Sequence, residues 1–343
     1  MPAASVPTDT GVLSAVGNTP LVALTRLLGH SRFRLFAKLE GLNPGGSMKD
    51  RPAAAILRGA LEAGTIGRNT AVVESSSGNL AVGLAQACAY HGLRFISVVD
   101  PKASQQNLAI LRAYGAEIEM VSAPDPETGE YLPARLARVQ ELLCQIDNAF
   151  WPNQYANLDN PRAHHATVRE ILDKLDGRLD FLFCAVSTCG LLRGCAEYLR
   201  EHRLGTKVVA VDAVGSVIFG RRPGRRLLPG HGAAVRPALF RGDLHDEVLH
   251  VSDLDCVVGC RRLVRSEAIL AGGSSGAVVT AVSRLQSAVP DGAACVAVLP
   301  DRGERYLDTV YSDAWVSQHF GDVSHLWSEA GGVVPCATTT SRS

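Results

Sequence analysis

A lysine that follows a glycine-rich turn is the first candidate for chemistry in this sequence. Lys49 lies in the stretch NPGGSMKDR, residues 43–51. We expect a helix to begin directly after it, with Asp50 as the N-cap and Pro52 in the first turn. A lysine amine held at such a junction can form an imine with a carbonyl cofactor. Since most lysines beside a turn are solvated surface charges, Lys49 alone does not decide the matter.

Three turns rich in small residues lie where further helices are expected to begin. They read ESSSGNL at 74–80, VSTCGL at 186–191 and AGGSSG at 271–276. The free backbone N–H groups of a helix N-terminus stabilise an anion. The first turn suits a substrate carboxylate, the second a monophosphate and the third a hydroxyl contact to a heterocycle. The second has neither a Walker lysine nor the glycine spacing of a dinucleotide site. Each turn alone could also be an ordinary helix start.

Strands and helices alternate around these turns. The expected strands are 71–74, 95–99, 117–121, 181–186, 207–211 and 295–299, and the expected helices are 80–91, 108–114, 191–201 and 277–286. This alternation is typical of right-handed βαβ units and parallel sheets. The two βα series predict an α/β fold with two lobes, each built on a twisted, mostly parallel sheet.

Composition excludes several classes of protein. The chain has 343 residues, of which 46% are hydrophobic, enough for two lobes with cores of their own. Lysine plus arginine and aspartate plus glutamate both number 34, so we expect no nucleic-acid or membrane surface. The N-terminus lacks the pattern of a secretory signal. Nine scattered cysteines indicate reduced thiols in a cytoplasmic protein, and no metal site is expected.

Lys49 and the three turns together resemble the fold-type II pyridoxal-phosphate enzymes of the cysteine synthase and cystathionine β-synthase family. The resemblance extends from about Gly17 to Leu307. It implies pyridoxal 5′-phosphate as cofactor and Lys49 as its covalent anchor and the catalytic residue. The other implied cofactor-binding residues are Asn79 at the 3′-oxygen, Ser187, Thr188, Cys189, Gly190 and Leu191 at the phosphate, and Ser274 at the pyridine nitrogen. The implied substrate-binding residues are Ser75, Ser76, Ser77, Gly78, Gln154 and Tyr155.

Departures from the family pattern narrow the expected function. Leu80 replaces the threonine usual in cysteine synthases, and 187–191 read STCGL in place of GTGGT. With DPK at 100–102, WPNQY at 151–155 and AVGSVIFG at 213–220, these changes look most like the 2,3-diaminopropionate branch. That branch implies a β-replacement joining O-phospho-L-serine to L-glutamate. Phosphate leaves, and N-(2-amino-2-carboxyethyl)-L-glutamate forms on the way to L-2,3-diaminopropionate for a siderophore or peptide natural product.

The resemblance also implies roles for two side chains. Lys49 would remove the substrate's α-proton and return it later. The neutral Ser274 would make the cofactor a weaker electron sink than a carboxylate would, which favours prompt β-elimination. A phosphoserine substrate needs a cation, which Arg221, Arg222, Arg225 and Arg226 could supply, although a solvated basic loop is an equally open interpretation.

Other functions stay open. The nearest alternative is a cysteine synthase that uses O-acetylserine or O-phosphoserine with sulfide. A cofactor-binding regulatory protein without catalysis and a serine or threonine dehydratase would share the cofactor site. The family habit is a homodimer.

The expected domains follow from the same pattern. Residues 45–150 would form a smaller, mobile domain, and 1–44 with 151–325 a larger domain that anchors the cofactor. The segment 147–161 would lie between the lobes, and 220–237 would be a long surface loop. Residues 326–343 are expected to be a disordered tail.

Overall fold

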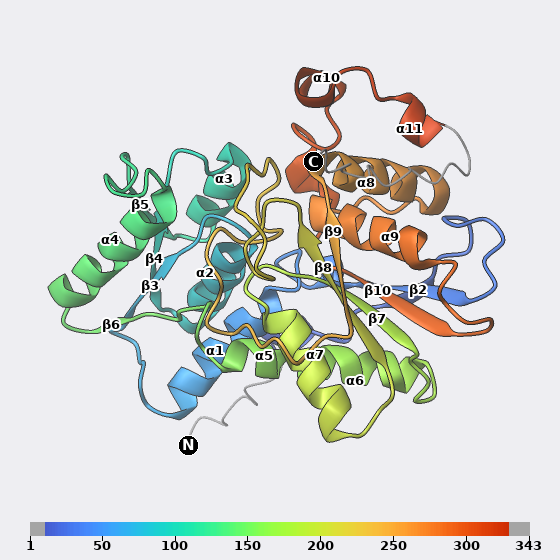
Figure 1. Ribbon diagram of the computed structural model, residues 1–343. Helices are drawn as coiled ribbons and strands as arrows, with labels where there is room; N and C mark the ends of the chain where they lie inside the picture. Colours follow the sequence, from blue (N-terminus) through green and yellow to red (C-terminus); the bar gives the residue numbers. More distant parts are fainter. Residues whose placement is uncertain (1–10, 329–343) are drawn as a thin grey trace.

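The chain forms two lobes, each built around its own sheet (Figure 1). The computed structural model describes residues 11–328. The larger sheet contains, in spatial order, β1 (Leu21–Ala23), β2 (Arg34–Leu39), β10 (Ala294–Leu299), β7 (Phe181–Ala185), β8 (Lys207–Ala213) and β9 (Glu247–Val251). The smaller sheet contains β5 (Glu117–Met120), β4 (Arg94–Val99), β3 (Ala71–Ser75) and β6 (Ala149–Phe150). Apart from the antiparallel β1–β2 pair, neighbouring strands are parallel, which confirms the expected fold class.

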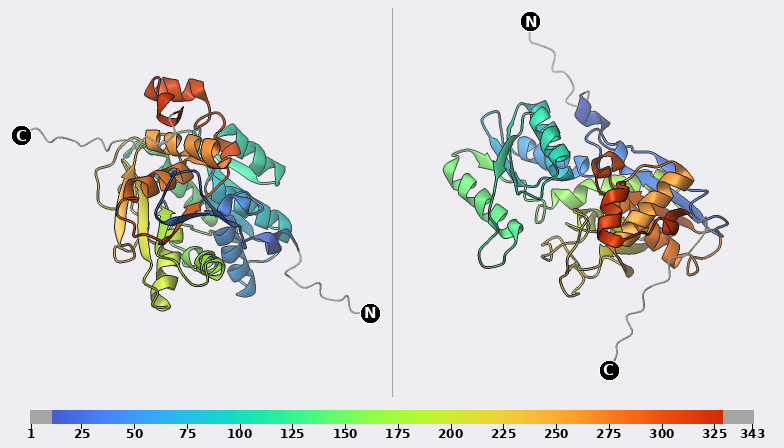
Figure 2. Two further views of the ribbon diagram at one scale, coloured as in Figure 1. Left: turned by 90° about the vertical axis from the view of Figure 1, so that its right-hand side faces the viewer. Right: turned by 90° about the horizontal axis from the view of Figure 1, so that it is seen from above.

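Helices cover both faces of each sheet (Figures 1 and 2). In the smaller lobe they are α1 (Asp50–Glu62), α2 (Asn79–His91), α3 (Gln105–Ala113) and α4 (Tyr131–Gln145). The larger lobe contains α5 (Asp159–Ala163), α6 (His165–Lys174), α7 (Gly190–Glu201), α8 (Asp253–Glu267), α9 (Gly273–Leu285), α10 (Asp313–Phe320) and α11 (His325–Ser328). Of these, α10 and α11 lie above α8 in Figure 1, away from the sheet. Within residues 11–328, three short 3₁₀ helices complete the elements, η1 (Val12–Ala15), η2 (Glu40–Leu42) and η3 (Gly303–Tyr306).

Strand β10 shows how the sequence builds a layer buried on both sides. All six of its residues are buried. Cys295, Ala297 and Leu299 face the core under α8 and α9, whereas Ala294, Val296 and Val298 face the core under α6 and α7. A strand with a core on each face needs apolar residues at every position, because successive side chains point to opposite faces. The unbroken run ACVAVL therefore specifies a central strand.

The structure confirms each expected strand and helix and moves some of their ends. Helix α9 begins at Gly273, four residues before the expected start, and α3 begins at Gln105, three residues early. Helices α4 and α8 were not expected from the sequence. The segment 147–161 does connect the lobes, since β6 joins the smaller sheet and α5 packs against both α1 and α7. The stretch 220–237 contains no helix or strand, as expected.

The disordered tail was expected to begin at residue 326, but the ordered part of the chain extends beyond that residue. Residues 326–328 belong to α11, where Trp327 is buried in the core beside α8. An indole gains too much from burial to be left in a solvated tail. Residues 329–343 lie outside the described part of the chain.

Candidate active site

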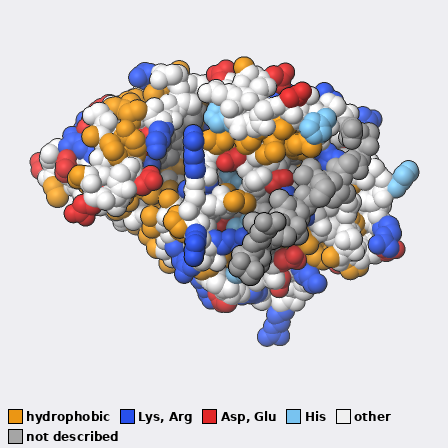
Figure 3. Space-filling model, turned by 45° about the horizontal axis from the view of Figure 1, so that its top comes forward, with side chains coloured by type: hydrophobic (Ala, Val, Ile, Leu, Met, Phe, Trp, Pro, Cys, Tyr) orange, Lys and Arg blue, Asp and Glu red, His pale blue; other side chains and the backbone are white. Residues whose placement is uncertain are grey.

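One cavity between the lobes collects most of the residues singled out from the sequence. Its lining includes Lys49, the turns after β3, β7 and β10, and the loop before β9. The residues that line it are Met48, Lys49, Ser75, Ser76, Ser77, Gly78, Asn79, Leu80, Arg135, Gln154, Tyr155, Ala185, Ser187, Thr188, Pro229, Gly230, Ser274, Pro300, Asp301 and Tyr306. Figure 3 shows lysine and arginine side chains gathered along the boundary between the two lobes. The cavity lies at the carboxyl ends of parallel strands, where α/β folds bind ligands.

Backbone hydrogen bonds fix Lys49 at the start of helix α1. Met48 donates its N–H to the Pro300 carbonyl at 2.7 Å, and the Lys49 N–H is 3.1 Å from Ser47 Oγ. Lys49 itself is the N-cap of α1, so the expectation of Asp50 as N-cap is wrong by one residue. The Asp50 carboxylate turns back to accept the Gly45 N–H, which holds the glycine turn closed instead of capping the helix.

The environment of the Lys49 amine makes it a better nucleophile than an ordinary lysine. The side chain is partly exposed, towards the cavity. Burial lowers the pKa of Lys49 from 10.5 to about 8, although the nearby Cys189 and Asp301 act in the opposite direction. A large fraction of this amine is therefore neutral near pH 8, as covalent attachment and proton transfer both require.

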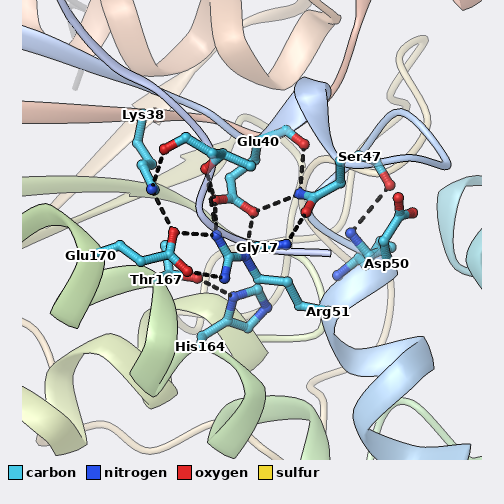
Figure 4. A network of polar contacts seen from close by, with 12 residues as sticks. Gly17, Lys38, Glu40, Ser47, Asp50, Arg51, His164, Thr167 and Glu170 are labelled. Carbon is cyan, nitrogen blue, oxygen red and sulfur yellow. Dashed lines mark hydrogen bonds and ion pairs between the residues drawn. The ribbon is translucent and has the colours of Figure 1, made fainter. Parts of the chain in front are cut away.

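A buried ion network is centred on Arg51, two residues after Lys49 in the sequence (Figure 4). The Arg51 guanidinium forms a two-point contact with Glu40, at 2.7 and 2.8 Å, and another with Glu170, at 2.8 and 2.7 Å. Lys38 Nζ is also 2.6 Å from Glu170. Lys38 is 1% exposed and Glu40 is fully buried. Two positive and two negative charges thus balance inside the protein.

The network fixes the start of α1 to three other elements. Lys38 comes from β2, Glu40 from η2, Arg51 from the first turn of α1 and Glu170 from α6. Burial alone would raise the pKa of Glu170, but its contacts with Arg51 and Lys38 lower it to about 2. Because Arg51 follows Lys49 by two residues, a rigid Arg51 also restricts where Lys49 can lie. No motif in the sequence pointed to this network.

The turn after β3 presents donors to the cavity. Gly78 is the N-cap of α2 and has no capping side chain. The carbonyl oxygens of Ser76 and Ser77 accept hydrogen bonds from Ser97 Oγ at 2.6 Å and from Asn107 Nδ2 at 3.0 Å. Since these carbonyls are engaged, the turn offers hydroxyls and backbone N–H groups to a ligand. Such a turn suits a carboxylate.

Gln154 and Tyr155 line the same cavity. The buried carboxyl group of Glu74, which was not singled out from the sequence, holds the segment that carries them. Glu74 accepts hydrogen bonds from the indole of Trp151 at 3.3 Å and from the Gln154 N–H at 3.4 Å. Burial raises the pKa of Glu74 to about 7, although these hydrogen bonds act to lower it. Asn160 Nδ2 holds the Gln154 carbonyl from the other side at 2.7 Å. Glu74 thus connects the strand before the serine turn to the segment that carries Gln154.

The turn after β7 divides between ligand-facing and protein-facing residues. Ser187 and Thr188 line the cavity, whereas Cys189, Gly190 and Leu191 do not. Cys189 is the N-cap of α7 in the left-handed region, with φ +66°. A Cβ at Gly190 would lie 2.0 Å from Asn160 Oδ1, so only glycine fits. The last three residues therefore shape the turn and leave the N-terminus of α7 for an anion.

Ser274 also lines the cavity, in the first turn of α9. Asp301 and Tyr306 line the same cavity, and Tyr306 Oη donates to Asp301 Oδ2 at 2.5 Å. Neither was singled out from the sequence. Serine, tyrosine and a buried carboxyl group can together orient a polar heterocycle.

Arg135 is an arginine at the cavity that the sequence analysis did not single out. It extends from α4 to the cavity, and its Nε is 3.3 Å from Asp100 Oδ2. None of Arg221, Arg222, Arg225 and Arg226 lines the cavity. Arg226 instead donates to the His231 carbonyl at 2.9 Å, and the loop contributes Pro229 and Gly230 to the lining. Arg135 could not be singled out from the sequence, because helix α4 was not expected.

The donors at this cavity fit the cofactor that the sequence resemblance implies. The cavity holds an amine with a lowered pKa, a helix N-terminus for a phosphate, an asparagine amide and a serine hydroxyl. Among residues 11–328, no three His, Cys, Asp or Glu side chains come together to hold a metal ion. Nor does any helix within that range have the length and apolar character needed to cross a membrane.

Comparison with known sequences agrees with this chemistry. Residues 12–301 match the family described as pyridoxal-phosphate dependent enzyme. The chain is 49% identical over 328 residues to the N-(2-amino-2-carboxyethyl)-L-glutamate synthase of Ralstonia nicotianae. That alignment covers 95% of each protein.

Solved structures show the same fold. The O-acetylserine dependent cystathionine β-synthase of Helicobacter pylori has a TM-score of 0.81 and 30% identity, covering 88% of this chain and 99% of that one. The cysteine synthase of Entamoeba histolytica has a TM-score of 0.82 and 30% identity, covering 95% and 98%. The chain therefore belongs to the pyridoxal-phosphate-dependent enzymes, as a β-replacement enzyme of the fold-type II, cysteine synthase-like group.

Proposed function

We propose that the enzyme joins O-phospho-L-serine to L-glutamate, releasing phosphate and forming N-(2-amino-2-carboxyethyl)-L-glutamate. The name of the Ralstonia relative, 49% identical over 95% of both chains, supports the product. The observation that carries the choice of phosphoserine is Arg135, a guanidinium at the cavity that also holds Lys49 and the serine turn. An arginine provides the paired donors that a phosphate ester binds best.

The residues of the cavity divide into cofactor and substrate groups. In our proposal Lys49 attaches the cofactor, Asn79 contacts its 3′-oxygen, Ser274 its pyridine nitrogen, and the N-terminus of α7 with Ser187 and Thr188 its phosphate. Pyridoxal phosphate, when bound, withdraws electrons from the α-carbon of the substrate and so weakens the bonds around it. The turn Ser76–Asn79 and Gln154 hold the substrate carboxylate.

Lys49 then moves the proton that the reaction requires. Its neutral amine accepts the α-proton of the bound amino acid, and its protonated form returns a proton after the new bond forms at Cβ. Arg135 binds the phosphate before and after it leaves, and Tyr155 closes the wall beside Gln154. Pro229 and Gly230 from the loop 220–237 line the same cavity.

The lowered pKa of Lys49 leads to a pH prediction. When apoenzyme is mixed with pyridoxal phosphate, we expect the rate of covalent attachment to rise about tenfold per pH unit below pH 8 and then to level off. The neutral amine is the nucleophile, and its fraction saturates above the lowered pKa. The growth of the visible absorbance between pH 6 and 10 measures this rate. A rate still rising at pH 10 would indicate an ordinary lysine.

The proposed role of Arg135 can be tested against a matched arginine. We expect Arg135→Ala to lower kcat/KM for O-phosphoserine on the order of 10- to 100-fold, because a charged hydrogen bond to the phosphate is lost. The value for O-acetylserine should change little. Arg138→Ala is the control, since Arg138 lies one turn further along α4 and pairs with Glu119 and Glu141. An equal loss for both substrates would contradict a phosphate-binding role.

Cysteine synthesis is the second candidate, because solved cysteine synthases share the fold at 30% identity. The two functions differ in nucleophile. Supplying phosphoserine with L-glutamate or with sulfide, and identifying the product by mass, separates them. Cysteine as the product, with no glutamate adduct, would overturn our assignment.

A homodimer and a cytoplasmic location are proposed, the latter because the eight cysteines of residues 11–328 are free thiols. The product would supply 2,3-diaminopropionate for a siderophore or peptide natural product. We also keep the division into a smaller mobile domain, 45–150, and a larger one, 1–44 with 151–325, as a prediction.

A further inference from the structure

Asn79 is held between two charged side chains of the other lobe. It is the first residue of α2 in the smaller lobe, whereas Asp301 follows β10 and Arg305 lies in η3 of the larger lobe. Asn79 Nδ2 donates to Asp301 Oδ2 at 2.7 Å, and Arg305 Nη1 donates to Asn79 Oδ1. The two partners thus engage opposite ends of one amide.

These partners leave the amide only one favourable orientation. A side-chain amide has an oxygen that accepts and a nitrogen that donates, and the two ends have nearly the same shape. The Arg305 guanidinium can only donate, so it requires the Asn79 oxygen on its side. Asp301 Oδ2 receives hydrogen bonds from both Asn79 and Tyr306, so it serves as an acceptor. Rotating the amide by 180° would break both contacts at once.

The clamp formed by Asp301 and Arg305 is itself held in place. Asp301 is 3% exposed, and Tyr306 Oη binds its Oδ2 at 2.5 Å. A Cβ on Gly272 would lie 2.1 Å from Asp301 Oδ1, so the carboxyl group is packed directly against the backbone before Ser274. Arg305 also donates to the Gly45 carbonyl, in the glycine turn before Lys49. The clamp therefore connects the lysine turn, the Ser274 turn and Asn79.

We propose that Asp301, acting with Arg305, is a positioning residue that keeps the amide nitrogen of Asn79, and not its oxygen, available to the cofactor. Nδ2 carries two hydrogens, and Asp301 takes one of them. The second remains for an acceptor in the cavity, such as the 3′-oxygen. This inference rests on the proposed contact between Asn79 and the cofactor, and it is independent of which amino acids react. The alternative interpretation is that the contacts of Asn79 with Asp301 and Arg305 only hold the two lobes together.

Exchanging the side chains of Asn79 and Asp301 distinguishes a role in orienting the amide from a role in holding the lobes together. In Asp301→Asn the fixed acceptor is lost, and we expect cofactor affinity to fall roughly tenfold, with a shifted visible absorbance of the loaded enzyme. In the double variant Asn79→Asp with Asp301→Asn, the donor and acceptor exchange places and the contact between the lobes can form again. Residue 79 then offers only an acceptor, so the urea midpoint should recover while the cofactor affinity does not.

The measurements are the cofactor dissociation constant, the visible spectrum and the urea midpoint of the apoenzyme. Glu304→Gln is the control, since Glu304 forms an exposed pair with Arg302 beside the clamp, and all three readouts should stay unchanged. A double variant with wild-type affinity and spectrum would overturn the proposal, as would Asp301→Asn without effect on either.

Asn79→Ala identifies the failing step. An unchanged spectrum there refutes the contact of Asn79 with the cofactor, whereas a shift confined to Asn79→Ala refutes only the clamp. Neither result involves phosphoserine or glutamate, so the proposed function is tested separately.

Discussion

Lys49→Ala is expected to abolish both the visible absorbance of the bound cofactor and turnover. Lys49 is the one lysine that lines the cavity within residues 11–328, and its pKa is lowered to about 8. It would supply both the covalent attachment and the proton transfers, so its removal costs two functions. We expect a loss of at least about 10³-fold in kcat, since general acid–base catalysis alone contributes 10²–10⁴-fold.

Two variants serve as controls for this result. Lys102→Ala removes an exposed lysine that lies 5.2 Å from the centre of the Tyr131 ring, and it should leave absorbance and turnover unchanged. Lys49→Arg keeps the positive charge but has no amine that can attach the cofactor. The measurements are an absorbance scan after dialysis and a product assay by mass. A Lys49→Ala protein that keeps its absorbance and its turnover would refute the assignment of the site.

Arg51→Met is expected to have the largest effect on stability. It leaves Glu40 and Glu170 in the interior with only Lys38 to balance them. Removal of one partner from a buried ion pair typically costs about 3–5 kcal/mol, because the remaining charge stays desolvated. Urea unfolding measures this loss. Arg51→Met combined with Glu40→Gln should recover part of it, since one of the unpaired charges is then gone.

An exposed pair of similar geometry provides the control. Arg94 and Glu117 also form a two-point contact, at 2.7 and 2.8 Å, with side chains 50% and 52% exposed. Arg94→Met should therefore cost no more than about 1 kcal/mol. If Arg51→Met cost no more than Arg94→Met, the buried network would not be what fixes the start of α1.

The loss in Arg51→Met should also depend on pH. The pKa of Glu170 is lowered from 4.5 to about 2 in the folded protein by Arg51 and Lys38, which outweigh burial. This contribution to stability is present above pH 4.5 and disappears as the pH falls towards 2. Removing Arg51 removes much of it. The difference in unfolding free energy between wild type and Arg51→Met should therefore narrow below pH 4.5.

The position of Lys49 and the two lobes could be predicted because their signals are local. Strands such as ACVAVL at 294–299 announce a layer buried on both faces, and small-residue turns announce helix starts that bind anions. Helix α4 gave no such signal. It has no capping side chain at Glu130, and its buried residues are limited to Val139 and Leu142. Because α4 was not predicted, Arg135 was not considered. A cation for the phosphate of phosphoserine was sought in the loop 220–237 instead.

The sequence by itself determined which residues are candidates for attaching the cofactor, Lys49 and the three turns, because each of these motifs lies within a few residues of the chain. Tertiary structure alone decided what surrounds them. Arg51 meets Glu170 across 119 residues and Asn79 meets Asp301 across 222. The burial that shifts the pKa of Lys49 and of Glu74 likewise arises only in the folded protein. Charge pairing and desolvation act through space, so no spacing along the chain can announce them.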